Sequence, residues 1–119
     1  MTEKFMGERT LMRVFIGESD RCVAGTHKGR PLYEALLLFF RERGLAGTTV
    51  VRGMAGFGAS ARLHTDRVLR LSTDLPVIVE VVEEEDRIQE VLPELDTMIS
   101  GGLVTLEKAR VILYRSGGS

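Results

Sequence analysis

The chain has 119 residues, a length typical of one domain rather than two. Its 44% hydrophobic and 28% charged residues are typical of a globular protein that buries a conventional core. The 16 Lys and Arg residues nearly balance the 17 Asp and Glu residues, and the net charge of -1 argues against broad electrostatic capture of nucleic acid or of an anionic membrane.

The single cysteine, Cys22, excludes an intramolecular disulfide framework and a cysteine-rich zinc site. Two histidines without a third ligand also argue against a metal site. No run of the sequence approaches the roughly 20 apolar residues of a membrane span, and residues 1–9 are too polar for a secretory signal. We therefore expect a cytoplasmic protein that forms one domain over residues 1–119, with frayed tails at residues 1–8 and 116–119.

Residues 9–17 predict a first strand with apolar side chains on both faces, namely Leu11, Met12, Val14, Phe15 and Ile16. A polar loop then leads to Pro31, which we expect at the first position of a helix. This helix is predicted over residues 30–43, because apolar residues recur there at helical spacing, and Gly44 is suited to end it.

Residues 48–53 are rich in β-branched side chains and predict a second strand. A third strand is predicted over residues 75–82, again apolar on both faces. The segment between them, about residues 55–73, is too long for a turn, and we expect it to form a long mobile loop.

The acidic run at residues 83–86 is suited to the start of a second helix, where carboxylates meet the positive end of the helix dipole. Helical spacing continues to Gly101, although Pro93 either kinks this helix or lies nearer to its true start. Residues 103–114 predict a last strand or a pair of short strands.

The order β-α-β, loop, β-α-β is that of the α+β ferredoxin-like fold, in which two helices lie on one face of a four-stranded antiparallel sheet. Helices on one face leave the other face uncovered, yet three of the predicted strands are apolar on both sides. Nothing else in the chain can cover the second face, so we expect a homo-oligomer whose sheets pack together.

Three stretches carry a resemblance to a known family: RGMAGFG followed by LHT, DLPVIVEVVEEEDRI, and LPELDTMISGGLVTLEKARVI. Together they resemble the uncharacterised PII-like family DUF190, from about Arg9 to Tyr114. That family is similar to the PII signalling proteins, which are ferredoxin-like trimers that bind adenine nucleotides between subunits and engage partners through a loop after the second strand. The resemblance implies a PII-like trimer with an adenine nucleotide as effector and no other cofactor.

The first ligand-binding segment that the resemblance implies is glycine-rich. Gly56-Phe57-Gly58, just after Gly53, resembles the Gly-Phe-Gly at the base of the PII loop. Glycines allow a backbone to approach a ligand closely and to direct amides at an anion. The alternative is that these glycines serve only a tight bend.

The second implied segment is Ser100-Gly101-Gly102, at the position of the glycine loop that cradles phosphates in PII proteins. The lysine of that loop is missing, because Leu103 follows directly, and the lysine at the start of the third strand is replaced by Val77. These departures argue against ATP binding in the PII manner more than against a monophosphate, a cyclic nucleotide or another small anion. Arg115 either resembles the basic segment that closes the PII cleft or is an ordinary terminal charge, because its spacing to the last strand differs from the PII pattern.

The long loop carries four basic candidates: His64, Arg62, Arg67 and Arg70. His64 either contacts a phosphate, or is solvated or caps a turn. The three arginines could bind an acidic partner, for which the resemblance suggests a membrane transport protein or an enzyme. A second basic cluster, His27 with Lys28 and Arg30, either holds an anion at the start of the first helix or is solvated.

Three functions remain open at this point. The first is a PII-like sensor that binds a small effector, and the second is a small enzyme with His64 as general base in the same cleft. The third is a structural interaction module without a ligand. No P-loop, zinc signature or Ser-His-Asp order supports an enzyme, and so few aromatic residues argue against nucleic-acid binding.

Overall fold

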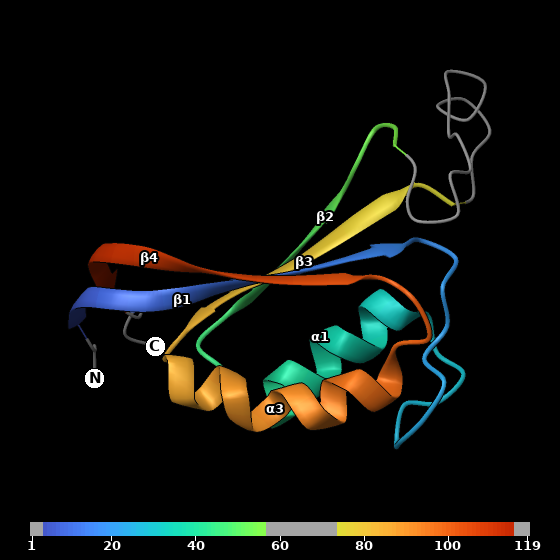
Figure 1. The fold of residues 1–119 in the computed structure, drawn as a ribbon, viewed down its shortest axis with the longest axis horizontal. Helices are drawn as coiled ribbons and strands as arrows, with labels where there is room; N and C mark the ends of the chain where they lie inside the picture. Colours follow the sequence, from blue (N-terminus) through green and yellow to red (C-terminus); the bar gives the residue numbers. More distant parts are fainter. Residues whose placement is uncertain (1–3, 57–73, 116–119) are drawn as a thin grey trace.

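The computed structural model describes residues 4–56 and 74–115. Its elements are β1 (Lys4–Gly17), α1 (Leu32–Glu42), β2 (Thr48–Arg52), β3 (Pro76–Glu83), α3 (Glu85–Met98) and β4 (Leu103–Arg115). The four strands form one antiparallel sheet in the order β2-β3-β1-β4, and both helices lie against the same face of it (Figure 1). The predicted ferredoxin-like fold is therefore confirmed.

The first strand is longer than predicted. It begins at Lys4, which pairs with Arg115 of β4, so the expectation of a frayed tail is wrong for residues 4–8. The pairing shifts between Phe5 and Gly7, and this irregularity interrupts the apolar alternation by which the sequence predicts strands. The last strand is a single one and extends through Arg115.

The start of α1 corrects a second expectation. Pro31 is the residue before the helix, with ψ of 133°, and not its first helical residue. It forms an isolated bridge with Arg21, while the Leu32 amide donates to the Asp20 carbonyl at 2.8 Å. The predicted end is confirmed, because Gly44 adopts φ of +72° after the last turn.

Helix α3 passes through Pro93, which lies well inside it rather than near its start. Proline has no amide hydrogen to donate to the carbonyl of Gln89, and both residues are exposed, so water can satisfy that carbonyl. The acidic run is divided between two elements. Glu83 is the buried last residue of β3, Glu84 precedes the helix, and Glu85 lies in its first turn.

The core fills the space between the sheet and the two helices. Fully buried side chains come from all the layers, among them Met12 and Val79 of the sheet, Leu36 of α1 and Ile88 of α3. Burying an aliphatic side chain of this size contributes about 1.5–3 kcal/mol to stability. Among the helices of residues 4–56 and 74–115, none is both long and apolar enough to cross a bilayer.

Polar contacts join the end of α1 and the start of α3 where β2 begins and β3 ends. The carboxylate of Glu83 accepts the Ala46 amide at 2.6 Å, and Arg87 donates to the Gly44 carbonyl at 2.8 Å. At the start of α3, Thr10 donates to Glu85 at 2.7 Å, and this hydrogen bond lowers the pKa of Glu85. The charged carboxylate therefore remains at the positive end of the helix dipole.

A matched pair of leucines on α1 tests the packing. Leu36→Ala removes a fully buried side chain and is expected to lower the free energy of unfolding by about 2–5 kcal/mol. Leu37→Ala, next to it but 40% exposed, is expected to lower it by less than about 1 kcal/mol. Urea denaturation of both variants checks this, and equal losses would contradict the placement of α1.

Candidate functional site

One end of the sheet gathers the predicted ligand-binding glycines. In the strand register Arg52 pairs with Val77, Gly17 with Pro76, and Phe15 with Leu103. The end of β2, the start of β3, the end of β1 and the start of β4 therefore lie in a row, at the right in Figure 1. We call this row of strand ends the site edge and define it by residues 17–20, 52–56, 74–76 and 99–102. It runs across all four strands and is distinct from the two edge strands, β2 and β4.

At the site edge, Gly53 and Gly56 both pack on the ring of Pro76. A Cβ atom at Gly53 would lie 2.9 Å from Pro76 Cγ, and one at Gly56 would lie 3.2 Å from the same atom. The Gly53 amide also donates to the Pro76 carbonyl at 2.7 Å. Close packing in the folded chain is thus enough to account for these two glycines, whether or not a ligand binds.

Gly101 and Gly102 differ in what the fold requires of them. A Cβ atom at Gly102 would lie 2.8 Å from the Phe15 carbonyl oxygen, and the residue has φ of +150°. At Gly101 a Cβ atom would meet nothing within 4 Å. Packing therefore accounts for Gly102, whereas the folded chain gives no steric reason for glycine at position 101.

Both glycines lie at one end of a groove between α3 and the edge strand β4. The groove has a volume of about 530 Å³ and is lined by Leu92, Leu95, Asp96, Ile99, Ser100, Gly101, Gly102, Val104 and Leu106. Val104 and Leu106 are each 38% exposed. Because the described residues of this lining are mainly apolar and include no basic one, the groove suits a flat apolar group better than a chain of phosphates.

A single chain leaves the two glycine segments apart. One follows β2 and the other precedes β4, the two edge strands of the sheet, so three strand spacings or about 14 Å separate them. Arg115 is farther away still, because β4 has 13 residues and places it about 40 Å from Gly102. One chain therefore does not bring Arg115 to the glycine segments, and only a second copy could supply it.

Several predicted residues lie outside the described part of the chain. They are Phe57, Gly58, His64, Arg62, Arg67 and Arg70, together with most of the predicted loop over residues 55–73. The structure therefore tests neither the ligand contacts nor the partner contacts assigned to them.

The basic cluster before α1 is paired with acids. His27 Nε2 lies 3.1 Å from the carboxylate of Glu42, and Arg30 donates to Glu34 at 2.6 Å. This pairing argues against an anion site there. Cys22 is buried and donates its thiol to the Ala24 carbonyl, and residues 4–56 and 74–115 contain no cluster of metal-ligating side chains.

Sequence reasoning missed an ion pair at the site edge. Arg52 Nη1 donates to Glu18 Oε2 at 2.8 Å, across the start of β3. The sequence signal was present, because Arg52 directly precedes the first of the predicted ligand-binding glycines. Its partner could not be inferred, since Glu18 lies 34 residues earlier in the chain.

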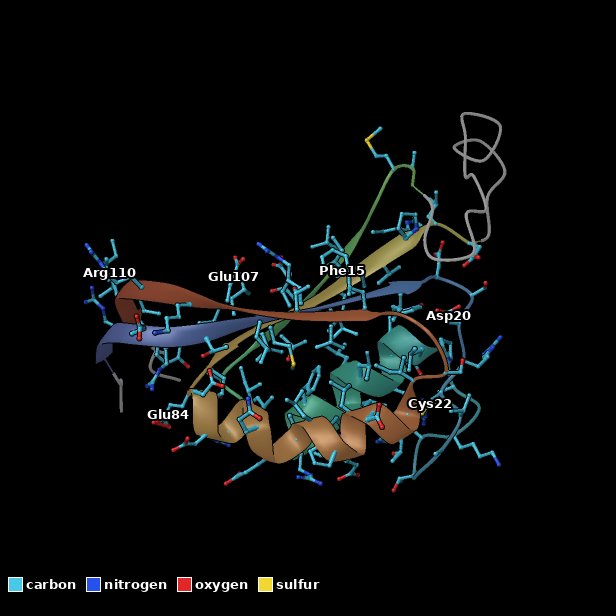
Figure 2. All side chains as sticks on the ribbon, viewed as in Figure 1. Phe15, Asp20, Cys22, Glu84, Glu107 and Arg110 are labelled. Carbon is cyan, nitrogen blue, oxygen red and sulfur yellow. The ribbon has the colours of Figure 1, made fainter. Side chains whose placement is uncertain are left out.

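The face of the sheet without helices is exposed in the single chain. Its residues nearest the site edge form an apolar row across all four strands: Val51, Ile78, Phe15 and Leu103. Figure 2 shows Phe15 and Glu107 on this side of the sheet. In the next row Arg13 donates to Glu80 at 2.8 Å and to Glu107 at 3.3 Å, and the contact with Glu80 raises the pKa of Arg13.

Adjacent glycines give a direct test of the site-edge packing. Gly102→Ala is expected to lower the free energy of unfolding by more than about 1 kcal/mol, because its Cβ would press on the Phe15 carbonyl. Gly101→Ala should leave stability unchanged or slightly increased, because its Cβ meets open space and alanine restricts the unfolded chain. Chemical denaturation distinguishes the two variants, and a Gly102→Ala protein as stable as the parent would refute the close approach.

Residues 9–111 match the family DUF190, described as "Uncharacterized ACR, COG1993". A UPF0166 protein from Aquifex aeolicus is 36% identical over 105 residues, covering 88% of this chain and 94% of that protein. A UPF0166 protein from Methanocaldococcus jannaschii is 30% identical over 102 residues, covering 85% and 89%.

Among solved structures, the fold is similar to CPII from Thiomonas intermedia K12, a nitrogen regulatory PII-like protein. CPII bound to ADP, AMP and bicarbonate has a TM-score of 0.51 at 13% identity, covering 92% of this chain and 96% of that one. CPII bound to ADP and bicarbonate has a TM-score of 0.52 at 14% identity, covering 92% and 91%. At such identities the likeness concerns the fold alone. The family match shows that the chain belongs to the DUF190 family, and its fold is similar to that of a PII-like protein.

Proposed function

We propose that the protein is a PII-like regulatory protein that binds a small effector, an adenine nucleotide, in clefts between the subunits of a homotrimer. The observation that carries this proposal is the site edge, where the strand ends bring Gly53, Gly56, Gly101 and Gly102 to one end of the sheet, with Gly101 and Gly102 in the lining of a groove. Glycine segments let backbone amides approach a ligand closely.

The subunit clefts follow from what a single chain lacks. Its two glycine segments lie about 14 Å apart, at opposite edges of the sheet. The uncovered face carries an apolar row that another chain can bury, and β4 exposes further apolar side chains, Ile112 with 73% exposure among them. A second copy would both cover this surface and bring its own Arg115 to the effector.

The chemistry of the groove selects among adenine nucleotides. Its apolar lining would hold the adenine ring, and the Gly101 amide would be available to a phosphate. Val77, in the place of the PII lysine, is buried in the core and offers no charge. The proposal therefore favours AMP or ADP over ATP, and the ligands of the CPII structures are among the first to test.

Partner binding is the second part of the proposal. Arg62, Arg67 and Arg70 would bind an acidic surface of a partner protein, such as a membrane transport protein or an enzyme, in the cytoplasm. His64, Phe57 and Gly58 would contact the effector from the same segment. An effector controls such contacts only if it binds one conformation more tightly than another. The role is regulatory, so bound nucleotide would be released unchanged.

Thermal denaturation against ATP, ADP, AMP, cyclic AMP and bicarbonate tests effector binding. A ligand that binds only the folded state stabilises it by about 2.7 kcal/mol at one hundred times its Kd. We expect AMP or ADP to raise the Tm in a concentration-dependent manner. The nucleotide should be recovered unhydrolysed, and steady turnover would indicate the enzyme instead.

Two glycine variants make the test specific to the groove. Gly101→Leu should abolish the nucleotide-dependent rise while leaving the Tm of the free protein nearly unchanged, because position 101 is sterically open. Gly47→Leu is the matched control, since Gly47 is equally open but lies before β2, away from the site edge. If no nucleotide shifts the parent Tm, the nucleotide proposal is wrong.

A further inference from the structure

The proposed effector is an anion, yet its groove has no cation. The described residues that line the groove include only one charged side chain, Asp96, which is acidic. An anion bound there would need a positive partner from elsewhere on the site edge. Within the site edge as defined, Arg52 is the only basic residue.

Arg52 can reach the groove only across a contact between subunits, because β2 and β4 are the two edge strands and about 14 Å separates them in one chain. Its own position is nevertheless suited to binding a ligand. Arg52 is the last residue of β2 and immediately precedes Gly53. The Gly53 amide donates to the Pro76 carbonyl, and this hydrogen bond holds the backbone from which the Arg52 side chain extends. Its side chain is 61% exposed. A guanidinium group matches the planar oxygens of a phosphate or carboxylate and makes paired hydrogen bonds with them.

The present partner of Arg52 is held in place by the backbone. The Glu18 amide donates to the Leu75 carbonyl at 2.8 Å, and the next amide, that of Ser19, donates to Asp74 Oδ1 at 3.1 Å. Glu18 is therefore the fixed member of the ion pair, with its side chain only 25% exposed. Arg52 is the member that can turn toward another anion.

The ion pair is incompletely satisfied. Glu18 Oε2 accepts from Arg52, but Glu18 Oε1 is buried and has no hydrogen-bond partner among residues 4–56 and 74–115. A buried carboxylate oxygen without a donor is unfavourable, so this pair is weaker than a fully satisfied one. The exposure of the Arg52 side chain weakens the ion pair further, because exposed ion pairs contribute little to stability.

We propose that Arg52 is the oxyanion-binding residue of the site, and that the effector's oxyanion competes with the Glu18 carboxylate for its guanidinium group. This inference rests on the proposed function for the identity of the effector but not for the role of Arg52. The oxyanion would belong either to the phosphate of the nucleotide or to a free anion such as bicarbonate. In both cases Glu18 lowers the affinity for the anion, because the anion must displace the Glu18 carboxylate from Arg52.

The test measures binding of ADP, adenosine, bicarbonate and inorganic phosphate by isothermal titration calorimetry to the full-length protein and three variants. Arg52→Gln is expected to weaken ADP binding by about tenfold or more, since it removes a charge-assisted hydrogen bond. Adenosine, which has no oxyanion, should bind the parent and this variant equally. Glu18→Gln removes the competing charge and should tighten ADP binding about two- to fivefold.

Arg41→Gln is the matched control, because Arg41 is an exposed arginine in the last turn of α1 and its loss should not change ADP binding. The melting temperature of each free variant is measured beside its affinity. If ADP binds the parent and Arg52→Gln equally, the role of Arg52 is overturned while the nucleotide proposal stands. A loss of adenosine binding that equals the loss of ADP binding would also overturn it, because the variant would then have damaged the whole site.

The remaining outcomes separate the two proposals. If ADP does not bind but bicarbonate or phosphate binds the parent and not Arg52→Gln, the nucleotide proposal fails and the role of Arg52 stands. If the parent binds neither nucleotide nor anion, both are overturned. Weaker ADP binding to Glu18→Gln than to the parent would contradict the competition, since it would show that Glu18 assists the ligand.

Discussion

The register of β1 against its two neighbours is the constraint on which the rest of the structure depends. β1 pairs with β3 on one side and β4 on the other, and it places Met12, Val14 and Ile16 under the helices. A shift of one residue would reverse the two faces and expose this core. The same register aligns the strand ends that form the site edge, so the core and the candidate site are determined by one set of hydrogen bonds.

Under the proposed function, that constraint also makes one chain an incomplete binding unit. With both helices on one face, the other face keeps an apolar row next to the site edge, in which Val51 and Leu103 are exposed. The glycine segments lie at opposite edges of the sheet, and Arg115 lies at the far end of β4. Burying the apolar row against other copies and completing the effector cleft would therefore be a single event. In this account, assembly and ligand binding are coupled because they use the same end of the sheet.

Much of the fold could be predicted from the sequence, because two-sided apolar strands and the helical spacing in α1 and α3 are local patterns. The boundaries that were predicted wrongly are determined by partners that are distant in the sequence. Residues 4–8 form a strand because β4 extends to meet them, despite the irregularity at Gly7. Glu83 belongs to a strand rather than to a helix start because it pairs with Thr10 of β1, and its carboxylate accepts the Ala46 amide.

The site was only partly accessible to such reasoning. The glycine segments can be found in the sequence. Local spacing does not show, however, that packing requires glycine at position 102 and not at 101, because the requirement comes from the Phe15 carbonyl, far away in the chain. The pairing of Arg52 with Glu18 likewise joins two segments that meet only through the sheet. Distant contacts of this kind have no signature in local spacing, which explains why the ion pair was missed.

Native mass spectrometry of the full-length protein with ADP or AMP tests the central claim most directly, because it reports assembly and ligand stoichiometry together. The account predicts trimers that carry up to one nucleotide per chain and single chains that carry none. Single chains that bind nucleotide as well as trimers do, or a protein that remains monomeric while it binds, would contradict the claim that the site is completed between subunits.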